Sequence, residues 1–181
     1  EFSFLSRTTH EILELLQSEQ VDIAVATTTD FDATGILETP LLRDPFVLVL
    51  PAGDDFTPAA LTDLVDRSET LPFLRYHNRQ FLGRRIEAQM RRLDARFDRR
   101  MEFETTHVIL SLVAAGRGWT VTTMLNFARA QRFHSKLRVL PFPGSAFARD
   151  ISVLTQDYVP DVVTQMSIGT IRRSLRRMVI D

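Results

Sequence analysis

The sequence predicts an α/β protein, in which β-strands and α-helices alternate along one chain. Three observations support this prediction: short runs of β-branched and aromatic residues, segments between them with apolar residues at helical spacing, and residues typical of helix ends at the boundaries. Because strands that alternate with helices usually form a sheet covered by helices, we expect mainly parallel pairing. No internal repeat or low-complexity segment interrupts the pattern.

Short apolar runs predict the strands. The run at 21–26 has few polar residues, which is typical of a buried strand in a parallel sheet. Residues 36–51 are expected to form two extended stretches, because Pro40 and Pro45 interrupt the run. The remaining strands are expected at residues 2–5, 71–76, 101–105, 119–121, 137–142 and 150–155.

The first helix is expected to follow a turn at residues 6–9. Thr8 and Glu11 match a capping box, in which the hydroxyl and the carboxylate each satisfy a free backbone N–H. Further helices are expected around Leu61–Val65, from Phe81 to about Leu93, from near His107 to Gly116, and after Pro160. Their expected buried stripes are Ile12, Leu13 and Leu16; Phe81, Leu82, Ile86, Met90 and Leu93; Val108, Leu112 and Ala115; and Ile168, Ile171, Leu175 and Met178.

The segment L-V-A-A-G-R-G-W-T-V at 112–121 contains a glycine pair that invites a nucleotide-binding interpretation. A dinucleotide site needs the order strand, glycines, helix, so that the phosphate meets a helix N-terminus. Here the order is helix, glycines, strand. Gly116 is therefore predicted to close the helix in a left-handed conformation, and Gly118 to let the chain turn into the next strand.

Composition excludes several classes of protein. The 181 residues carry a formal net charge of −1, which gives no overall field for nucleic acid or an anionic membrane. The chain has no cysteine and four scattered histidines, so thiol chemistry is excluded and neither a metal nor a cofactor is indicated. No membrane span or signal peptide is evident, and the expected compartment is the cytosol.

Three short motifs occur in order along the chain. They are L-L-Q-S-E-Q-V-D-I-A-V-A at 15–26, P-L-L-R-D-P-F-V-L-V-L-P at 40–51 and V-A-A-G-R-G at 113–118. In this order and spacing the chain resembles the effector-binding domain of LysR-type transcriptional regulators over nearly its whole length. It departs from the family pattern at Glu19, where glycine is common, and at Thr123, near which proline is common.

The resemblance implies two Rossmann-like subdomains of the periplasmic-binding-protein type, joined by two crossing hinge strands near 47–51 and 151–155. Subdomain I would comprise residues 1–47 and 152–181, and subdomain II residues 48–151. It further implies that the chain begins after the usual first strand and helix, and that the N-terminal winged helix-turn-helix is absent from it. The implied partners are a small-molecule effector, further copies in a homodimer or homotetramer, and DNA through the absent domain only.

A candidate effector site follows from the fold. In open α/β sheets, ligands bind beyond the carboxyl ends of strands, where helix N-termini favour an anion such as a carboxylate. Three such junctions are expected, at residues 6–9, 77–79 and 105–107. The candidate effector-binding residues are Ser6, Thr8, Thr9, Thr27, His77, Asn78, Arg79, Thr105, Thr106, Trp119 and Thr120. The alternative is structural: the threonines cap helices, the histidines are solvated or structural, and Trp119 lies in the core or an interface.

Two further features allow alternatives. The arginine-rich stretch from Arg84 to Arg100 resembles a nucleic-acid patch, but a solvated helix face with Glu87 paired to Arg91 is favoured. No nucleophile elbow or paired-carboxylate motif supports a hydrolase. The sequence therefore favours a ligand-sensing domain that is not an enzyme, over a free-standing solute-binding protein and a small hydrolase.

Overall fold

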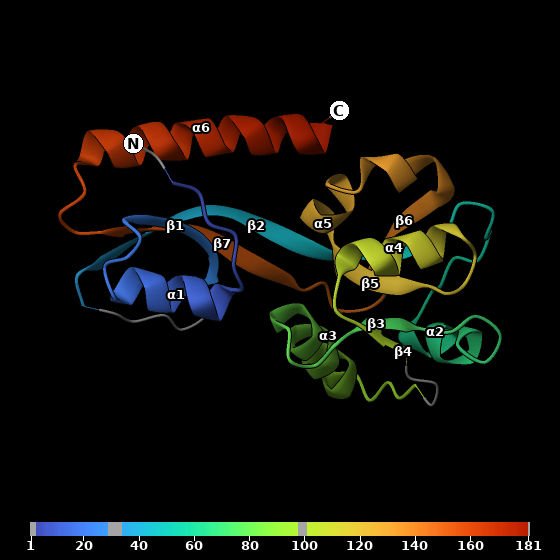
Figure 1. The fold of residues 1–181 in the computed structure, drawn as a ribbon. Helices are drawn as coiled ribbons and strands as arrows, with labels where there is room; N and C mark the ends of the chain where they lie inside the picture. The colour runs from blue at the N-terminus through green and yellow to red at the C-terminus, as the bar shows by residue number, and fades with distance from the viewer. Residues whose placement is uncertain (1–2, 29–33, 98–100, 181) are drawn as a thin grey trace. The chain divides into compact units, whose positions relative to one another are not determined.

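The computed structural model describes residues 3–28, 34–97 and 101–180, and it confirms the α/β class (Figure 1). The helices are α1 (Thr9–Gln17), α2 (Leu61–Arg67), α3 (Phe81–Arg92), α4 (Thr106–Ala114), α5 (Met124–Ala128), the 3₁₀ helix η1 (Gln131–Lys136) and α6 (Asp161–Ile180). The strands are β1 (Ile23–Thr28), β2 (Ile36–Pro51), β3 (Leu74–Tyr76), β4 (Met101–Phe103), β5 (Thr120–Thr123), β6 (Leu137–Pro141) and β7 (Ala148–Gln156). No helix in these ranges combines the length and hydropathy that a bilayer span needs.

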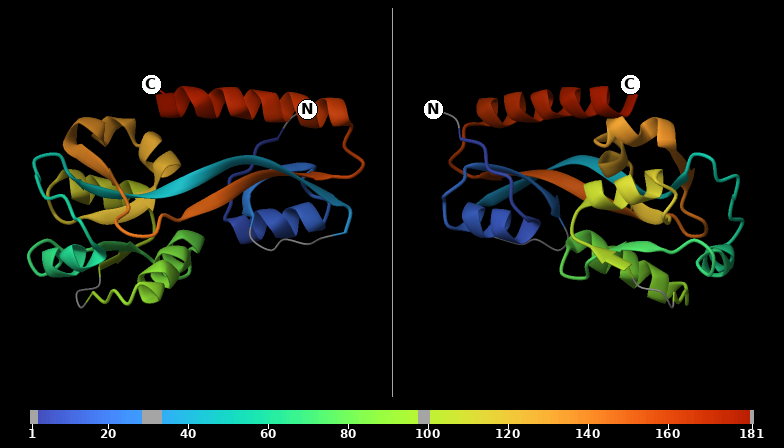
Figure 2. Two further views of the ribbon diagram at one scale, coloured as in Figure 1. Left: turned by 180° about the vertical axis from the view of Figure 1, so that it is seen from behind. Right: turned by 45° about the vertical axis from the view of Figure 1, so that its right-hand side comes forward.

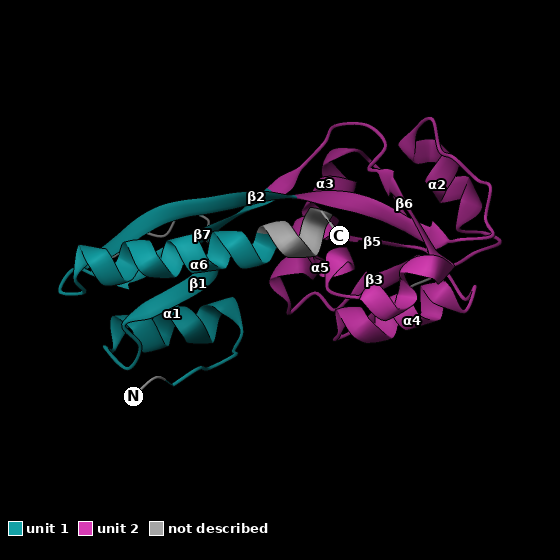
Figure 3. Ribbon diagram, turned by 90° about the horizontal axis from the view of Figure 1, so that it is seen from above, with its two compact units in different colours: residues 1–44, 149–181 teal, residues 45–148 magenta. Residues whose placement is uncertain are grey.

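The chain forms two compact units (Figure 3). Unit 1 comprises residues 1–44 and 149–181, and unit 2 comprises residues 45–148. The chain passes from one unit to the other within β2 and again within β7, so each of these long strands belongs to both units. The sequence-based boundaries were expected after residues 47 and 151.

The strand directions differ from the expected parallel pairing. In unit 1, β1 pairs with β7 antiparallel, with Ile23 opposite Thr155. In unit 2, β2 pairs antiparallel with both β5 and β6. Among the described strands, the parallel pairings are β3 with β4 and the single bridge between Phe73 and Trp119. The alternation of helices and strands along the chain does not determine whether neighbouring strands are parallel or antiparallel. Here β2 leaves unit 1 and β7 returns to it, and the two strands are neighbours in the sheet (Figure 2).

β2 runs unbroken through both of its prolines, so the prediction of two separate stretches is wrong. Proline fixes φ near the extended region and removes only one hydrogen-bond donor, which a strand tolerates where no ladder bond is needed at that residue. The first predicted strand is also wrong over the part that is described. Residues 3–8 are irregular, and the Phe4 side chain is 92% exposed. A strand requires a hydrogen-bonded neighbour, and no described strand pairs with this segment.

The hydrophobic core is much larger in unit 2. There the cluster includes residues 46–50 of β2 together with an aromatic group, in which Trp119 stacks on Phe73 at a centroid distance of 4.4 Å and contacts Phe97 edge-on. In unit 1 the buried cluster is Leu16, Ala24, Ala26 and Leu154. The larger core makes unit 2 the better-packed scaffold for a binding site.

Most helix predictions are confirmed, but α4 buries a different face from the one expected. Val108 is 43% exposed and Ala115 is also exposed, whereas Ile109, Leu110 and Val113 are buried. Six of the nine residues of this helix are apolar, more than one face can hold, so periodicity alone could not select the buried side. The stripe of α6 is confirmed at Ile168, with Ile171 and Leu175 half-buried, and the Met178 side chain lies outside the described side chains.

The glycine pair terminates α4 as predicted. Gly116 has a φ of +71°, its N–H donates to the Val113 carbonyl, and the Arg117 N–H donates to the Leu112 carbonyl, each at 2.9 Å. These two bonds make a Schellman motif. A Cβ at Gly118 would lie 2.6 Å from the Pro72 oxygen, so only glycine fits beside the segment that leads into β3. The segment is a helix end and not a phosphate cradle.

The predicted capping box of α1 is also confirmed. The Thr8 hydroxyl accepts from the Glu11 N–H, and the Thr8 N–H donates to the Glu11 carboxylate at 2.8 Å. Beyond the helix, Glu19 has a φ of +56°. The left-handed turn is therefore retained at the position where the family commonly has glycine.

The hydrogen bonds from the side chain and the backbone N–H of Thr8 lower the pKa of Glu11. The stabilisation they provide is present above the pKa of an unfolded glutamate and is lost as the pH falls through the lowered pKa of folded Glu11. In an NMR titration we expect the pKa of Glu11 to lie below the usual value for a glutamate. Thr8→Ala should raise its midpoint toward the ordinary range, because the side-chain hydrogen bond is the largest cause of the lowered pKa and the backbone bond remains. An unchanged midpoint would contradict the capping role.

Candidate functional site

Three strands of unit 2 end at the same edge. β3 and β4 are parallel, and the Phe73–Trp119 bridge places β5 parallel to β3. Each strand is followed by a helix: α3 after β3, α4 after β4 and α5 after β5. The amino ends of these helices therefore lie beyond the carboxyl ends of the strands, where ligands bind in open α/β sheets. We call this edge the carboxyl rim, defined by residues 76–80, 104–107 and 122–123.

A cluster of three hydroxyl groups lies in the rim. The Tyr76 hydroxyl donates to Thr106 Oγ1 at 3.0 Å and shares a 2.6 Å hydrogen bond with Thr122 Oγ1. Tyr76 and Thr122 are buried, and Thr106 is half-buried. The cluster therefore connects the ends of β3 and β5 with the first residue of α4.

Further hydrogen bonds hold the loop before α3 against the loop before α4. The His77 N–H donates to the Phe103 carbonyl at 2.9 Å, and Gln80 Nε2 donates to the Glu104 carbonyl. Gly83 lets α3 approach closely, because a Cβ there would lie 2.3 Å from the His77 oxygen. The amino ends of α3 and α4 are thus fixed side by side.

Arg79 provides an exposed positive charge in the rim. Its backbone N–H donates to His77 Nδ1 at 3.1 Å, and its carbonyl accepts from Arg84. Across the described ranges, its guanidinium has no acidic partner. Because Nδ1 accepts, Nε2 carries the proton of neutral His77, and it lies 3.9 Å from a Glu102 carboxylate oxygen.

The other predicted residues of unit 2 have different environments. Asn78 is exposed in the loop between β3 and α3, and Thr105 caps α4 by accepting from the Val108 N–H at 3.3 Å. Trp119 and Thr120 are fully buried, and the Thr120 hydroxyl donates to the Leu74 carbonyl at 2.7 Å. Their side chains offer no surface to a ligand in this structure, because core packing and a backbone hydrogen bond already occupy them.

The candidates in unit 1 do not form a comparable cluster among themselves. Ser6 and Thr8 are exposed, Thr9 is half-buried at the start of α1, and Thr27 is buried in β1. Thr8 is engaged in the capping box. Thr8 and Thr105 therefore both act as helix caps, which is the structural alternative given above for the threonines.

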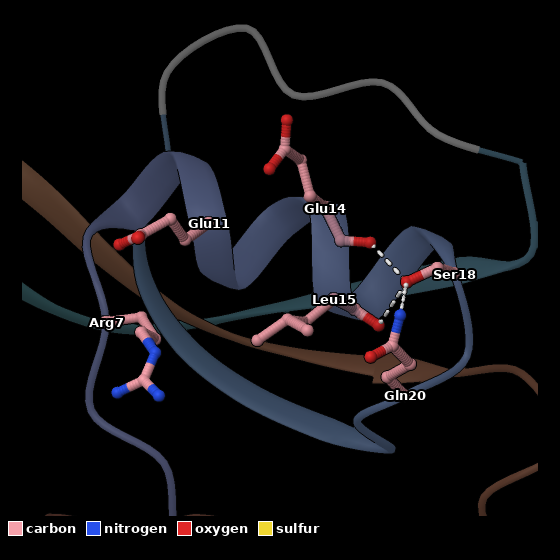
Figure 4. A pocket seen from close by; sticks show the side chains of 6 residues that line it. All are labelled: Arg7, Glu11, Glu14, Leu15, Ser18 and Gln20. Carbon is pink, nitrogen blue, oxygen red and sulfur yellow. Dashed lines mark hydrogen bonds between the residues drawn. The ribbon is translucent and has the colours of Figure 1, made fainter.

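Two hollows occur on unit 1. One, of about 300 Å³, lies beside α1, and its lining includes Glu11, Glu14 and Arg7 (Figure 4). In it Ser18 donates to the Glu14 carbonyl, and Gln20 donates to Ser18. The second, of about 450 Å³, is lined by residues 17, 19, 34–36 and 156–158. The charged side chains of the second hollow, Glu19 and Asp157, are both acidic, and in the first hollow two carboxylates face one arginine. Neither hollow therefore suits an anion as well as the carboxyl rim does.

The arginine-rich helix face also differs from expectation. Glu87 pairs with Arg75 of β3, which is 8% exposed, and not with Arg91. The arginines of α3 are exposed, as a solvated face requires, and Arg99 and Arg100 lie outside the described residues. No group of three potential metal-ligating side chains occurs in the described ranges.

Sequence analysis missed Tyr76 and Thr122. Two signals pointed to them: Tyr76 is the last residue of a predicted strand, directly before His77, and Thr122 lies two residues after Thr120. Alternate residues of a strand share a face, so Thr122 belongs with Thr120 on the side toward β3. The pattern T-x-T at 120–122 therefore indicates in the sequence that Thr122 lies on the same side of the strand as Thr120.

Comparisons with known proteins agree with this arrangement. The family model described as "LysR substrate binding domain" matches residues 1–157. Among solved structures, a cysteine mutant of OxyR from Corynebacterium glutamicum, bound to H₂O₂, has a TM-score of 0.73 at 20% identity, covering 96% of this chain and 55% of that one. The reduced regulatory domain of OxyR2 from Vibrio vulnificus has a TM-score of 0.70 at 19% identity, covering 93% and 78%.

The reduced OxyR regulatory domain from Pseudomonas aeruginosa has a TM-score of 0.68 at 18% identity, covering 91% of this chain and 79% of that one. No curated protein matched the sequence. The chain thus spans about half the length of the longest of these relatives and most of the two regulatory domains. At these identities the structures show a shared periplasmic-binding-protein-like fold, and the family model shows the family. The chain belongs to the LysR substrate-binding-domain family, the effector-binding domains of LysR-type transcriptional regulators.

Proposed function

We propose that this chain senses a small metabolite that carries a carboxylate, and that binding of this effector controls transcription allosterically. The observation that supports the proposal most directly is the carboxyl rim of unit 2. There the amino ends of α3 and α4 are held together beside the exposed guanidinium of Arg79.

The rim has the electrostatics that an anion requires. A helix amino end carries partial positive charge and free N–H groups, and the side chain of Gln80 does not cap α3. An arginine binds a carboxylate through two parallel hydrogen bonds. The half-buried hydroxyl of Thr106 supplies a donor and an acceptor that would orient the rest of the molecule, and the hydrogen bond from Tyr76 holds this hydroxyl in place. These features support a carboxylate over a cation as the ligand.

The proposed signal is reversible binding and not thiol oxidation. The structural neighbours include a cysteine mutant and reduced forms of OxyR. This chain contains no cysteine, so no thiol within these 181 residues can be oxidised. The effector is therefore proposed to act through differential affinity for two arrangements of the domain.

Other parts of the proposal come from the family resemblance. Ser6, Thr8, Thr9 and Thr27 remain proposed contacts, since the resemblance implies an effector bound between two subdomains. A homodimer or homotetramer would transmit the change to DNA-binding domains that are not part of these residues. The proposed compartment is the cytoplasm, because the regulated genes are there.

A thermal-shift screen tests the proposal. Purified protein would be mixed with acetate, succinate, citrate and benzoate, and sulfate would serve as the anion control. A carboxylate at about 100 times its Kd should stabilise the folded state by about 2.7 kcal/mol, which raises Tm measurably. Calorimetric titration of the best hit then gives the affinity.

Substitution identifies the site. Arg79→Gln should weaken binding of the best carboxylate about tenfold or more, because a hydrogen bond to a charged group contributes about 1.5–3 kcal/mol. Arg117→Gln is the matched control, since Arg117 is also exposed but follows the carboxyl end of α4. Equal affinities for Arg79→Gln and the parent protein would rule out the carboxyl rim as the site.

A further inference from the structure

One side of α3 is covered by positive charge. Its exposed arginines are Arg84, Arg85, Arg91 and Arg92. Seven residues make almost two helical turns, so Arg91 follows Arg84, and Arg92 follows Arg85, about 10 Å further along the same side of the helix. The buried residues of α3 lie on the other side, in the core of unit 2. We call the exposed side the arginine face, defined by these four arginines.

The positive charge of the arginine face is not neutralised locally. Glu87 is the one acidic residue of α3, and its carboxylate pairs with Arg75 of β3. The solvated face favoured from sequence required Glu87 to pair with Arg91. Within the described ranges, no ion pair includes an arginine of this face. Arg84 donates to the Arg79 carbonyl at 2.7 Å, but that acceptor is neutral and leaves the charge in place.

The formal net charge of −1 conceals an uneven distribution of charge within unit 2. Residues 54–69 include five acidic residues and one arginine, whereas residues 84–92 include four arginines and one glutamate. A local excess of one sign attracts an oppositely charged partner even when the net charge is near zero. The arginine face is therefore suited to a partner that carries several negative charges.

The chemistry of the face favours duplex DNA as this partner. A guanidinium binds a phosphate through two parallel hydrogen bonds, and duplex DNA carries one negative charge per about 1.7 Å of its axis. A membrane or a protein partner would require apolar side chains beside the charges, and a single strand would require aromatic rings for stacking. Between Arg84 and Arg92, the exposed residue that is not an arginine is Ala88.

We propose that the arginine face binds the phosphate backbone of duplex DNA. Contacts to phosphate position a protein on the duplex but do not read its sequence, so the binding is independent of base sequence. This proposal goes beyond effector sensing and does not depend on it. Arg79 is not part of the arginine face, and the experiment below uses no effector.

Fluorescence anisotropy tests the proposal on the 181-residue protein. The probe is a short labelled DNA duplex of mixed sequence, titrated with protein at salt concentrations from about 50 to about 200 mM. If all four arginines contact phosphates, the logarithm of the binding constant should fall against the logarithm of the salt concentration with a slope of about −3.6.

The main variant is Arg85→Gln with Arg92→Gln, which removes one charge at each end of the face. It should weaken binding at least tenfold at low salt and make the slope shallower by about 1.8, because two phosphate contacts are lost. The matched control is Arg117→Gln with Arg129→Gln. It removes the same charge from exposed positions of unit 2 outside α3, and it should bind the duplex as the parent does.

A second variant, Arg85→Lys with Arg92→Lys, keeps the charge and decides the question if the glutamine variant fails to fold. It should retain the salt slope of the parent, since a lysine also contacts phosphate as a point charge. The proposal is overturned if the parent does not bind the duplex at low salt, or if the control loses as much affinity as the main variant. Equally tight binding of phosphatidylserine vesicles or polyglutamate would also overturn it, because the face would then not favour DNA.

Discussion

Replacing Gly83 with alanine is expected to lower the free energy of unfolding by about 1–3 kcal/mol or more. The new Cβ would lie 2.3 Å from the His77 oxygen and 2.8 Å from the Tyr76 oxygen. Both neighbours are backbone atoms, so relief requires moving either α3 or the loop that carries Arg79. Urea denaturation followed by the fluorescence of the single tryptophan would measure the loss.

Gly53→Ala is the matched control for this experiment. A Cβ at Gly53 meets no atom within 4 Å, and Gly53 is not among the residues of positive φ. Its stability should therefore equal or slightly exceed that of the parent. If Gly83→Ala proved as stable as Gly53→Ala, α3 would not approach β3 as closely as described, and the geometry of the carboxyl rim would need revision.

Replacing Trp119 with alanine should be at least as severe, with a loss of about 3–5 kcal/mol. The side chain is fully buried between Phe73 and Phe97, and its removal leaves a large cavity in the core of unit 2. Urea denaturation followed by circular dichroism would measure this loss, since the fluorescent residue is removed.

Trp119→Phe separates a core role from a ligand-binding role. In the described part of the chain, the buried Nε1 of Trp119 has no hydrogen-bond partner, so phenylalanine loses packing volume but no hydrogen bond. We expect a smaller loss of stability than with alanine, and an unchanged affinity for any carboxylate found by the thermal-shift screen. A large loss of affinity in a folded Trp119→Phe protein would show that Trp119 contributes to ligand binding.

Features with a local physical cause were predictable from sequence. The capping box at Thr8 and the helix end at Gly116 each depend on residues a few positions apart, and both are confirmed. The gathering of His77, Arg79 and Thr106 at one rim was also predictable, because parallel strands bring their following loops to the same edge. The family resemblance added the fold type that local patterns alone did not specify.

Features that depend on distant partners were not predictable. Six of the nine residues of α4 are apolar, so their spacing does not define one buried side, and contacts from the rest of unit 2 select Ile109 and Val113 for burial. Glu87 had a plausible partner one helical turn away, yet it pairs with the buried Arg75 of a neighbouring strand. Trp119 has a side chain that is suited to ligand binding, and only its contacts with Phe73 and Phe97 show that it belongs to the core.

The amino-acid sequence alone was enough to infer the fold class, the helix caps, the glycine turn and the family, because each depends on short stretches of neighbouring residues. The tertiary structure alone decided the antiparallel strand directions, the hydroxyl cluster of Tyr76 and Thr122, and the contacts between Asp44 and Arg149. These features join residues dozens of positions apart, and such contacts are set by which surfaces pack together when the whole chain folds.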